Sequence, residues 1–347
     1  MLKINTQVGY KINMMRGKLS NVCTLLLVAL GLITGLSLQS NSVYAQGIAY
    51  PVKPITMVVP FPPGGVADIV ARPVAEALSR ELGQTVLVEN RAGAGGGIGM
   101  GYVARAKADG YTVLMALSSI TVIPEADVVV GRSPMFALSD LKPIARFTAD
   151  PTVLVVRADA PWHNLKEFLE DAKKRPHAIN YGSSGNYGTM HVPMVMLESG
   201  SGVSFTHVPF TGAGPALVGL LSGQIDAVAS GPATVLQNIK AGKLRALAQW
   251  GNARLDSLPE VHSLTEDGIN VQYAQWSGLF VPSAVPDSVV QRLRAAAKVA
   301  AADARVRETI AGAGSPIQYM DTLDFDRYVQ ADARKMGELV KKMGKLD

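Results

Sequence analysis

Cysteine is almost absent from this chain of 347 residues, which contains only Cys23. Cys23 lies at the front of an apolar run over residues 22–38, within a leader that we expect to be removed. The mature chain would then have no disulfide, no thiolate nucleophile and no cysteine-bound metal. Because 48% of the residues are hydrophobic, the protein can be stable through its core alone.

Acidic residues are missing from the first 45 positions, which carry Lys3, Lys11, Arg16 and Lys18. A basic start, the apolar run 22–38 and the small residues of Val43-Tyr44-Ala45 predict a secretory signal peptide over residues 1–45 and a periplasmic protein. The alternative is an uncleaved membrane anchor, although the run is short for a spanning helix, which needs about 20 apolar residues. The start codon could be Met1, Met14 or Met15. A lipid-attachment cysteine would follow the apolar run, so Cys23 does not predict lipidation.

Basic charge is scarce once the leader is set aside. The full chain has a net charge of +5, but removal of residues 1–45 takes away four of its 33 basic residues and none of its 28 acidic ones, leaving +1. No basic stripe remains, so the sequence argues against nucleic-acid binding.

Signatures of catalysis, metals and nucleotides are also missing. Residues 182–185, Gly-Ser-Ser-Gly, do not form a GxSxG nucleophile elbow, and the five histidines lack HxxxH or HExxH spacing. The glycines of residues 93–101 fail the GxGxxG spacing, and no Walker motif is present. We therefore expect no catalytic residue, no metal and no cofactor. His191 and His207 are interpreted as structural hydrogen-bonding residues rather than bases.

Predicted strands and helices alternate from residue 55 to about residue 250, which favours mostly parallel sheets with helices on both faces. Two amphipathic helices follow, over 287–302 and 324–342. Extended segments at 152–157 and 275–281 interrupt the alternation. If both segments cross between domains, residues 46–151 and 279–347 form one lobe and residues 152–278 form the other.

A turn that combines stiff and permissive residues joins the first strand to the first helix. Pro62 and Pro63 fix φ, whereas Gly64 and Gly65 allow close approach to the backbone. Such a turn presents bare N–H groups at a helix N-terminus and can bind an anion. Asp68 could cap the helix or accept a hydrogen bond from an amino group on the ligand. The alternative is an ordinary turn with an Asp cap.

Two further strand-to-helix loops have this character. Residues 180–191 carry three glycines and the hydroxyls of Ser183, Ser184 and Thr189; residues 206–214 lead into a helix opened by Pro215. Ligands of open parallel sheets lie beyond the carboxyl ends of strands, so the three loops predict a site shared by two lobes. Asp226 could anchor a loop or reach the ligand.

The same stretches carry a family resemblance. In order they read VVPFPPGGVADIVAR, VENRAGAGGGIGMGYVARAKADGYT, NYGSSGNYGTMH, THVPFTGAGPALVGLLSGQIDAVASGPA and IKAGKLRALA. This combination resembles the extracytoplasmic solute-binding receptors of tripartite tricarboxylate transporters, the Bug family, over nearly all of the mature chain.

The resemblance implies the α/β fold of a type II periplasmic binding protein, with two mixed-sheet lobes, crossing strands and a ligand cleft. It implies a receptor that captures a small carboxylated or amino-acid-like solute and delivers it to integral-membrane transporter subunits. We expect the receptor to be a monomer. The ligand-binding residues that it implies are Phe61, Pro63, Gly64, Gly65, Asp68, Ser118, Ser119, Ser183, Ser184, Gly185, Thr189, His191, Thr206, Phe210, Thr211, Gly212 and Asp226.

Several positions depart from the family pattern, so the sequence does not identify the solute. Relatives commonly have Tyr-Lys-Gly where this chain has Phe210-Thr211-Gly212, Tyr187 replaces a small residue, and residues 118–127 and 131–138 differ. Two other functions stay open at this point. One is a ligand sensor that signals to a membrane histidine kinase, and the other is a periplasmic hydrolase on the same fold.

Overall fold

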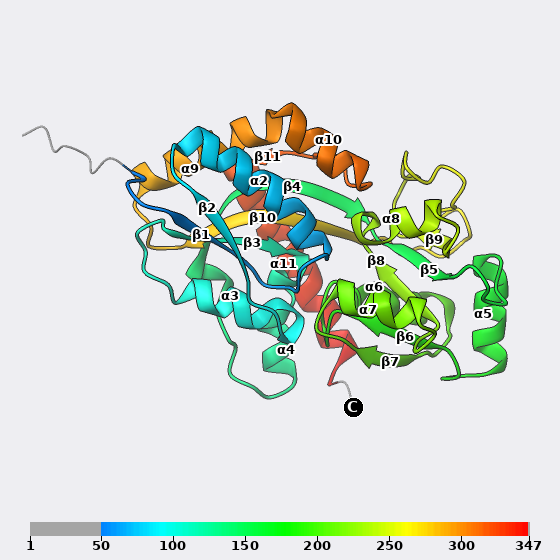
Figure 1. Cartoon of the computed structure of the whole chain (residues 1–347). Helices are drawn as coiled ribbons and strands as arrows, with labels where there is room; N and C mark the ends of the chain where they lie inside the picture. The colour runs from blue at the N-terminus through cyan, green and yellow to red at the C-terminus, as the bar shows by residue number, and fades with distance from the viewer. Residues whose placement is uncertain (1–49, 346–347) are drawn as a thin grey trace, which may run out of the picture. The chain divides into compact units, whose positions relative to one another are not determined.

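Two β-sheets organise the part of the chain that the computed structural model describes, residues 50–345 (Figure 1). The predicted signal peptide lies outside these residues. The first sheet has the strand order β11-β4-β10-β3-β1-β2 and the second β7-β6-β8-β5-β9. The first sheet contains β1 (Ile55–Val59), β2 (Val86–Asn90), β3 (Thr112–Leu117), β4 (Leu141–Pro151), β10 (Ala274–Pro282) and β11 (Met320–Asp321). The second contains β5 (Val153–Arg157), β6 (Asn180–Ser183), β7 (Thr206–Pro209), β8 (Ala227–Ser230) and β9 (Leu244–Gln249).

Both sheets are mixed, as expected for the fold class, rather than mostly parallel as the alternating pattern alone predicted. β1 pairs in parallel with β2 and β3, and β6 with β7 and β8. β10 runs antiparallel to β3 and β4, and β5 antiparallel to β8 and β9. β5 and β10 are the strands by which the chain enters the second sheet and returns to the first, and each runs antiparallel to its neighbours.

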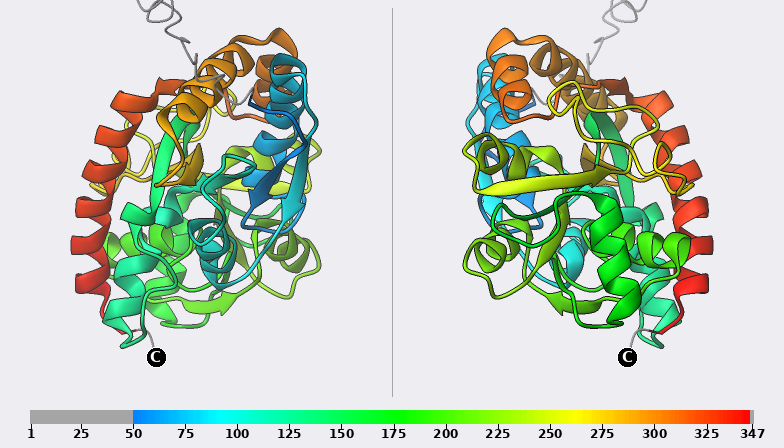
Figure 2. Two further views of the ribbon diagram at one scale, coloured as in Figure 1. Left: turned by 90° about the vertical axis from the view of Figure 1, so that its left-hand side faces the viewer. Right: turned by 90° about the vertical axis from the view of Figure 1, so that its right-hand side faces the viewer.

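Helices cover the sheets, as the views from two opposite sides show (Figure 2). α2, α9 and α10 pack against one another beside the first sheet, while α11 packs on β4 and α4. This group contains α2 (Val66–Leu82), α3 (Gly97–Ala104), α4 (Ile123–Val129), α9 (Asp287–Ala302), α10 (Ala304–Gly312) and α11 (Thr322–Met343). The second sheet carries α5 (Leu165–Lys174), α6 (Val192–Ser201), α7 (Ala213–Leu221) and α8 (Pro232–Lys240).

Local signals fix several helix ends. α2 ends at Gly83, whose φ of 67° is in the left-handed region that favours glycine. Asn164 caps α5 by accepting from the N–H of Glu167, and Asp303 caps α10 by accepting from Arg305 and Val306. The core of the first sheet includes Trp276, which meets Phe325 of α11 edge to face at 5.4 Å.

The two sheets are joined by β4–β5 and by the return of the chain from β9 to β10. Strands of the first sheet lie within residues 55–151 and 274–321, and strands of the second within 153–249. The division into two lobes at residues 151/152 and 278/279 stays a prediction. Within residues 50–345, we find no helix with the length and apolar character that a membrane span requires.

Candidate functional site

The turn from β1 into α2 holds its glycines where the backbone needs them. Gly64 has a φ of 78°, and Gly65 is the N-cap of α2 without a side-chain cap. The Gly64 N–H donates to Asp68 Oδ2 at 3.0 Å. No hydrogen bond within the described part of the chain engages the N–H groups of Gly65 and Val66. Two donors at the start of a long helix are thus left open.

Asp68 holds this turn together. Its carboxylate accepts hydrogen bonds from Arg72 at 2.8 and 2.9 Å and from Asn90 Nδ2 at 3.0 Å, and Asp68 is only 4% exposed. Burial alone would raise the pKa of Asp68, but the hydrogen bonds from Arg72, Gly64 and Asn90 lower it below the ordinary value. Asp68 therefore remains an anion that orders the loop.

Two loops of the second sheet face loops of the first sheet. One follows Ser183 at the end of β6, and the other follows Pro209 at the end of β7 and leads to Gly212, the N-cap of α7. A Cβ on Gly212 would lie 2.4 Å from Pro62 Cδ, and a Cβ on Gly185 would lie 3.0 Å from the Gly95 nitrogen. Loops of the two sheets are therefore in direct contact at two places.

A cavity of about 580 Å³ lies between these loops. The first sheet contributes Gly93, Ala94, Ile123, Ala126, Asp127, Arg132 and Met135, and the second contributes Gly185, Asn186, Tyr187, Pro209, Phe210, Thr211 and Pro215. A volume of this size is ordinary for a small-molecule site. The charged pair in its wall, Arg132 and Asp127, is held by contacts of Arg132 Nε and Nη2 at 3.2 and 2.9 Å to one oxygen, Asp127 Oδ1.

Buried polar groups without partners lie in the same loops and at the strands behind them. The hydroxyls of Ser184 and Ser230 and the Oε1 atom of Gln275 have no hydrogen-bond partner in residues 50–345. A Cβ on Gly231, the N-cap of α8, would lie 2.6 Å from Gln275 Oε1 and 2.8 Å from Val66 Cγ2. Gln275 therefore lies beside the N-termini of α2 and α8. Buried unpaired polar groups are costly, so their presence here indicates that another molecule satisfies some of them.

Comparison with known proteins assigns the family. The family model described as "Tripartite tricarboxylate transporter family receptor", TctC, matches residues 70–345. The chain belongs to this family. Its members are solute-binding receptors, which confirms the prediction that the chain is not an enzyme.

Solved structures of TctC and Bug receptors share the fold. The periplasmic binding protein BugD is 31% identical with a TM-score of 0.80, over 84% of this chain and 98% of BugD. MatC from Rhodopseudomonas palustris, solved with bound malate, is 28% identical with a TM-score of 0.79, over 84% of this chain and all of MatC. Another R. palustris protein, solved with adipate, is 26% identical with a TM-score of 0.79, over 84% of this chain and 97% of that protein. The present chain is thus a periplasmic solute-binding receptor of the TctC/Bug family with the predicted fold class.

A stack of neutral rings supports the receptor's second-sheet loops. His191 and His207 stack at 4.2 Å between ring centroids, and Tyr181 stacks on His207 at 5.0 Å. Burial lowers the pKa of His191 to about 3, with a smaller contribution from His207, and burial lowers the pKa of His207 to about 4. His191 Nδ1 accepts from the Tyr187 N–H at 3.0 Å, and Ser183 Oγ lies 2.6 Å from His207 Nε2. These contacts agree with structural roles for both histidines.

The predicted serines after β3 point into internal contacts. Ser119 Oγ donates to the Gly95 carbonyl at 2.8 Å, and Ser118 Oγ lies 3.1 Å from Tyr273 Oη. Phe61 packs under the same glycine loop, since a Cβ on Gly96 would lie 2.9 Å from its ring. Ser119 and Phe61 therefore hold the glycine loop, whose Gly93 and Ala94 line the cavity.

Of the predicted ligand-binding residues, only Gly185, Phe210 and Thr211 line the cavity, and two of the others lie at the far ends of the strands. Thr206 begins β7 and Asp226 precedes β8, so both lie at the amino ends of the parallel strands. Thr206 Oγ1 donates to the His177 carbonyl, and Asp226 Oδ2 accepts from the Asn180 N–H at 2.8 Å. Ser183, Phe210 and Thr211 lie at or beyond the opposite ends. Thr206 and Asp226 therefore do not share the location of the loops.

The structure adds three residues that the sequence did not single out. They are Arg132 and Asp127 in the cavity wall and Gln275 behind the loops. A local signal existed only for Gln275, a polar residue at the start of the mostly apolar segment 275–281. Among residues 50–345, no group of His, Cys, Asp or Glu is arranged to hold a metal ion.

Proposed function

We propose that the cavity between the loops binds a small carboxylated solute and that the receptor delivers it to integral-membrane transporter subunits. One observation carries the proposal. Loops from both sheets enclose a cavity that has Arg132 in its wall, while the Ser184 hydroxyl beside it is buried and unpartnered. The open N–H groups at the start of α2 do not line this cavity, and we propose that the site extends to them as further donors for an anion.

The donors are sufficient in strength for such a ligand. Each hydrogen bond to a charged group contributes roughly 1.5–3 kcal/mol. A helix N-terminus adds about 0.3–1 kcal/mol. A few of these together reach the roughly 8 kcal/mol of micromolar binding. The ligand residues in this proposal are Gly64, Gly65, Ser184, Gly185, Thr189, Phe210, Thr211 and Gly212, with Arg132 and Gln275 added.

Arg132 favours a second carboxylate on the solute. Both side-chain hydrogen bonds of Arg132 go to Asp127 Oδ1 and use Nε and Nη2. No described residue bonds to Nη1, so Nη1 can donate to a ligand. MatC and the adipate-bound protein were both solved with dicarboxylates, which supports this class without identifying the solute here. We therefore place dicarboxylates first among the candidates.

The lobes of this proposal are residues 46–151 with 279–347 and residues 152–278. β4–β5 and β10 form the hinge between them, and the loop contacts correspond to its closed form. Export would follow cleavage after Ala45. N-terminal sequencing of the exported protein tests the cleavage, and a membrane-bound form that retains residues 22–38 would contradict it.

A thermal-shift screen followed by calorimetric titration tests the ligand class. The screen contains monocarboxylates, dicarboxylates up to the length of adipate, amino acids, aromatic acids and neutral sugars. We expect dicarboxylates to give the largest stabilisation, and a preference for neutral sugars would overturn the proposal. Uptake of the labelled solute by cells with and without the receptor then tests delivery. Unchanged uptake without the receptor would limit the function to binding.

A further inference from the structure

A second and larger cavity, of about 1180 Å³, lies at the edge of the second sheet. None of its lining residues lines the cavity between the loops. Four consecutive residues of β9, from Leu244 to Leu247, line it. Successive side chains of a strand point to opposite faces, so four neighbours can line one cavity only if the strand presents its edge there. We call this cavity the β9 groove.

β9 is an edge strand, since β5 is its only partner in the sheet. The Ala158 N–H donates to the Lys243 carbonyl at 3.0 Å. This bond determines which residues of β9 turn their N–H and C=O groups toward β5 and which turn them away. Residues 243 and 245 then face β5, and the N–H and C=O groups of Leu244 and Ala246 face away from it. No other residue in the described range 50–345 bonds to the groups of these two residues.

The chain itself shows how this edge binds a strand. Gln249, further along the same edge, donates from its N–H to the His262 carbonyl at 3.0 Å and accepts from the Leu264 N–H at 2.9 Å. Ser263 thereby forms an isolated parallel bridge with Gln249. The pairing of residues 262–264 with β9 stops at Gln249, so the edge at Leu244 and Ala246 is open to another strand.

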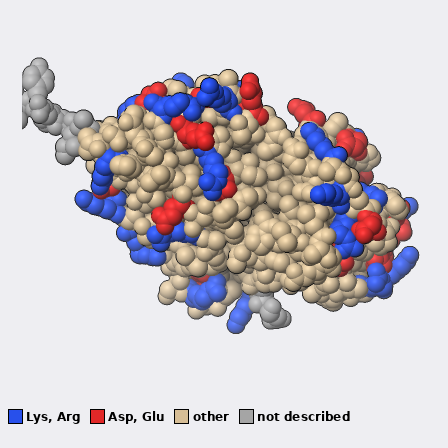
Figure 3. Space-filling model, in the orientation of Figure 1, with Lys and Arg blue, Asp and Glu red and all other residues tan. Residues whose placement is uncertain are grey.

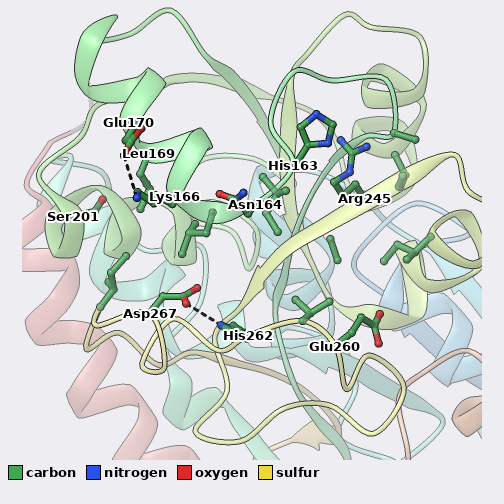
Figure 4. Close-up of a pocket in the computed structure, with 18 of the residues that line it drawn as sticks. His163, Asn164, Lys166, Leu169, Glu170, Ser201, Arg245, Glu260, His262 and Asp267 are labelled. Carbon is green, nitrogen blue, oxygen red and sulfur yellow. Dashed lines mark hydrogen bonds and ion pairs between the residues drawn. The ribbon is translucent and has the colours of Figure 1, made fainter.

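The β9 groove has an apolar wall on each side. α5 borders one side with Leu165 and Leu169, and the segment 260–269 borders the other with Val261 and Ile269. Figure 4 shows Asn164 and Lys166 on one side of β9 and Glu260 and His262 on the other. A recessed edge avoids the edge-to-edge aggregation that a protruding one invites.

The two walls differ in charge. On the α5 side, the lining contains Lys166, Lys173 and Arg245 and one acid, Glu170, which lies 3.9 Å from Lys166. Glu167 of α5 also interacts electrostatically with Arg245, so three basic groups meet two acids on this side. Lys173 and Arg245 form no ion pair within the described residues, and Arg245 Nη1 donates to the carbonyls of Ala160 and Trp162. The opposite wall carries Glu260, without an ion pair there, and Asp267, which pairs with His262. Acidic side chains on a bound strand would meet the α5 wall favourably.

We propose that the β9 groove is a strand-addition site for an extended segment of a partner protein. The segment pairs its backbone with Leu244 and Ala246, directs acidic side chains to the α5 wall, and directs apolar side chains to the opposite face. Charged residues are frequent around this end of the molecule (Figure 3). The inference is independent of the proposed function, because the two cavities share no residue.

The test uses a fluorescent, end-capped hexapeptide of alternating Val and Glu, and fluorescence anisotropy as the readout. A Val and Lys peptide is the control for charge, and a Val and Glu peptide methylated on alternate backbone nitrogens is the control for strand pairing. We expect the Val and Glu peptide to bind saturably, at least about tenfold more tightly than either control. Equal binding of the methylated peptide, or no saturable binding of the Val and Glu peptide, overturns the proposal.

Three variants locate the binding. Ala246→Pro removes an outward N–H, which edge strands tolerate, and should abolish peptide binding, whereas Ala246→Val keeps the N–H and should retain it. Lys173→Glu should weaken binding of the Val and Glu peptide and strengthen binding of the Val and Lys peptide.

If Ala246→Pro does not fold, hydrogen exchange of the wild-type protein replaces it. The peptide should slow exchange of the Leu244 and Ala246 amides, and unchanged rates overturn the proposal. A concentration-dependent dimer without peptide binding would assign the edge to a second copy and equally overturn it.

Discussion

Gln275 Nε2 donates to Thr189 Oγ1 at 2.8 Å, and this bond joins β10 of the first sheet to the loop before α6 of the second. Both residues are buried, and the other amide atom of Gln275, Oε1, has no partner within the described residues. A single side chain therefore both links the sheets and presents an open acceptor beside the N-termini of α2 and α8. Replacement of Gln275 therefore tests both contributions.

Gln275→Leu should weaken solute binding by up to about tenfold. The change removes one hydrogen bond between the two sheets and leaves the Thr189 hydroxyl buried without its donor, at a cost of about 1–3 kcal/mol in the closed form. Calorimetric titration measures the affinity, and Gln330→Leu, on the exposed face of α11, is the matched control. Wild-type affinity in a folded Gln275→Leu protein would show that the bond does not contribute to closure.

Gly212→Ala should block closure without unfolding the protein. The added Cβ would lie 2.4 Å from Pro62 Cδ, which belongs to a loop of the other sheet, and Gly212 has a φ of 170°, which any residue adopts. The clash exists only while the loops are in contact. We expect an unchanged melting temperature without solute and at least a tenfold loss of affinity, about 1.4 kcal/mol.

Small-angle scattering completes this test. The wild-type radius of gyration should fall on saturation with solute, whereas that of Gly212→Ala should not. Gly312→Ala is the control, because a Cβ there meets nothing within 4 Å. A Gly212→Ala protein that closes like the wild type would mean that the loops adjust and that the hinge proposal lacks this support.

Arg132 should determine selectivity between dicarboxylates and monocarboxylates. Arg132→Gln should reduce affinity for the preferred dicarboxylate about tenfold and change monocarboxylate affinity little, because only the second carboxylate meets the guanidinium. Arg132→Lys keeps the charge and should recover part of the loss. Since Asp127 is 1% exposed and keeps only the Met135 N–H as a donor in the Gln variant, the melting temperature of each variant must be measured as well. An equal loss for both ligand classes would refute a role in selectivity.

The three loops could be predicted from sequence because their Pro, Gly and hydroxyl residues are local signals. The turn before α2 and the loop ends at Ser183 and Phe210 follow from residues that restrict or free the backbone in place. Arg132 and Gln275 could not be predicted, because their roles depend on contacts with loops far away in the sequence. α4 was missed because Pro124 and a run of β-branched residues obscure its helical period, and β4 because it pairs only with distant strands.

His191→Asn should make the free energy of unfolding depend less steeply on pH in the acidic range. Burial lowers the pKa of His191 to about 3 in the folded protein, below about 6.5 in the unfolded chain, so the unfolded chain binds more protons between these values. The stability that His191 contributes is present above about pH 6.5 and is lost as the pH falls, by up to about 1.4 kcal/mol per pH unit. Asn offers an acceptor to the Tyr187 N–H without this titration. Urea unfolding of both proteins at several pH values measures the slope, and identical slopes would contradict the burial argument.

The effect of Asp150 on the pH dependence of stability should be opposite in sign to that of His191. It lies on β4 opposite Gln275 and is 1% exposed. Burial raises the pKa of Asp150 to about 7, and the nearby hydroxyls of Ser315 and Thr148 and the guanidinium of Arg146 offset this only in part. Neither carboxylate oxygen has a hydrogen bond of good geometry within residues 50–345.

The sign of the Asp150 effect follows from its raised pKa. The folded protein binds the extra proton between about pH 4 and about pH 7, so stability falls as the pH rises through this range and stays low above it. Asp150→Asn should therefore match the wild type near pH 4 and be more stable by a few kcal/mol, in order of magnitude, near pH 8. In urea unfolding, Asp150→Asn should make stability rise more steeply with pH, and His191→Asn should make it rise less steeply. The same sign for both variants would show that Asp150 is charged in the folded protein at every pH tested, with a partner that stabilises its carboxylate.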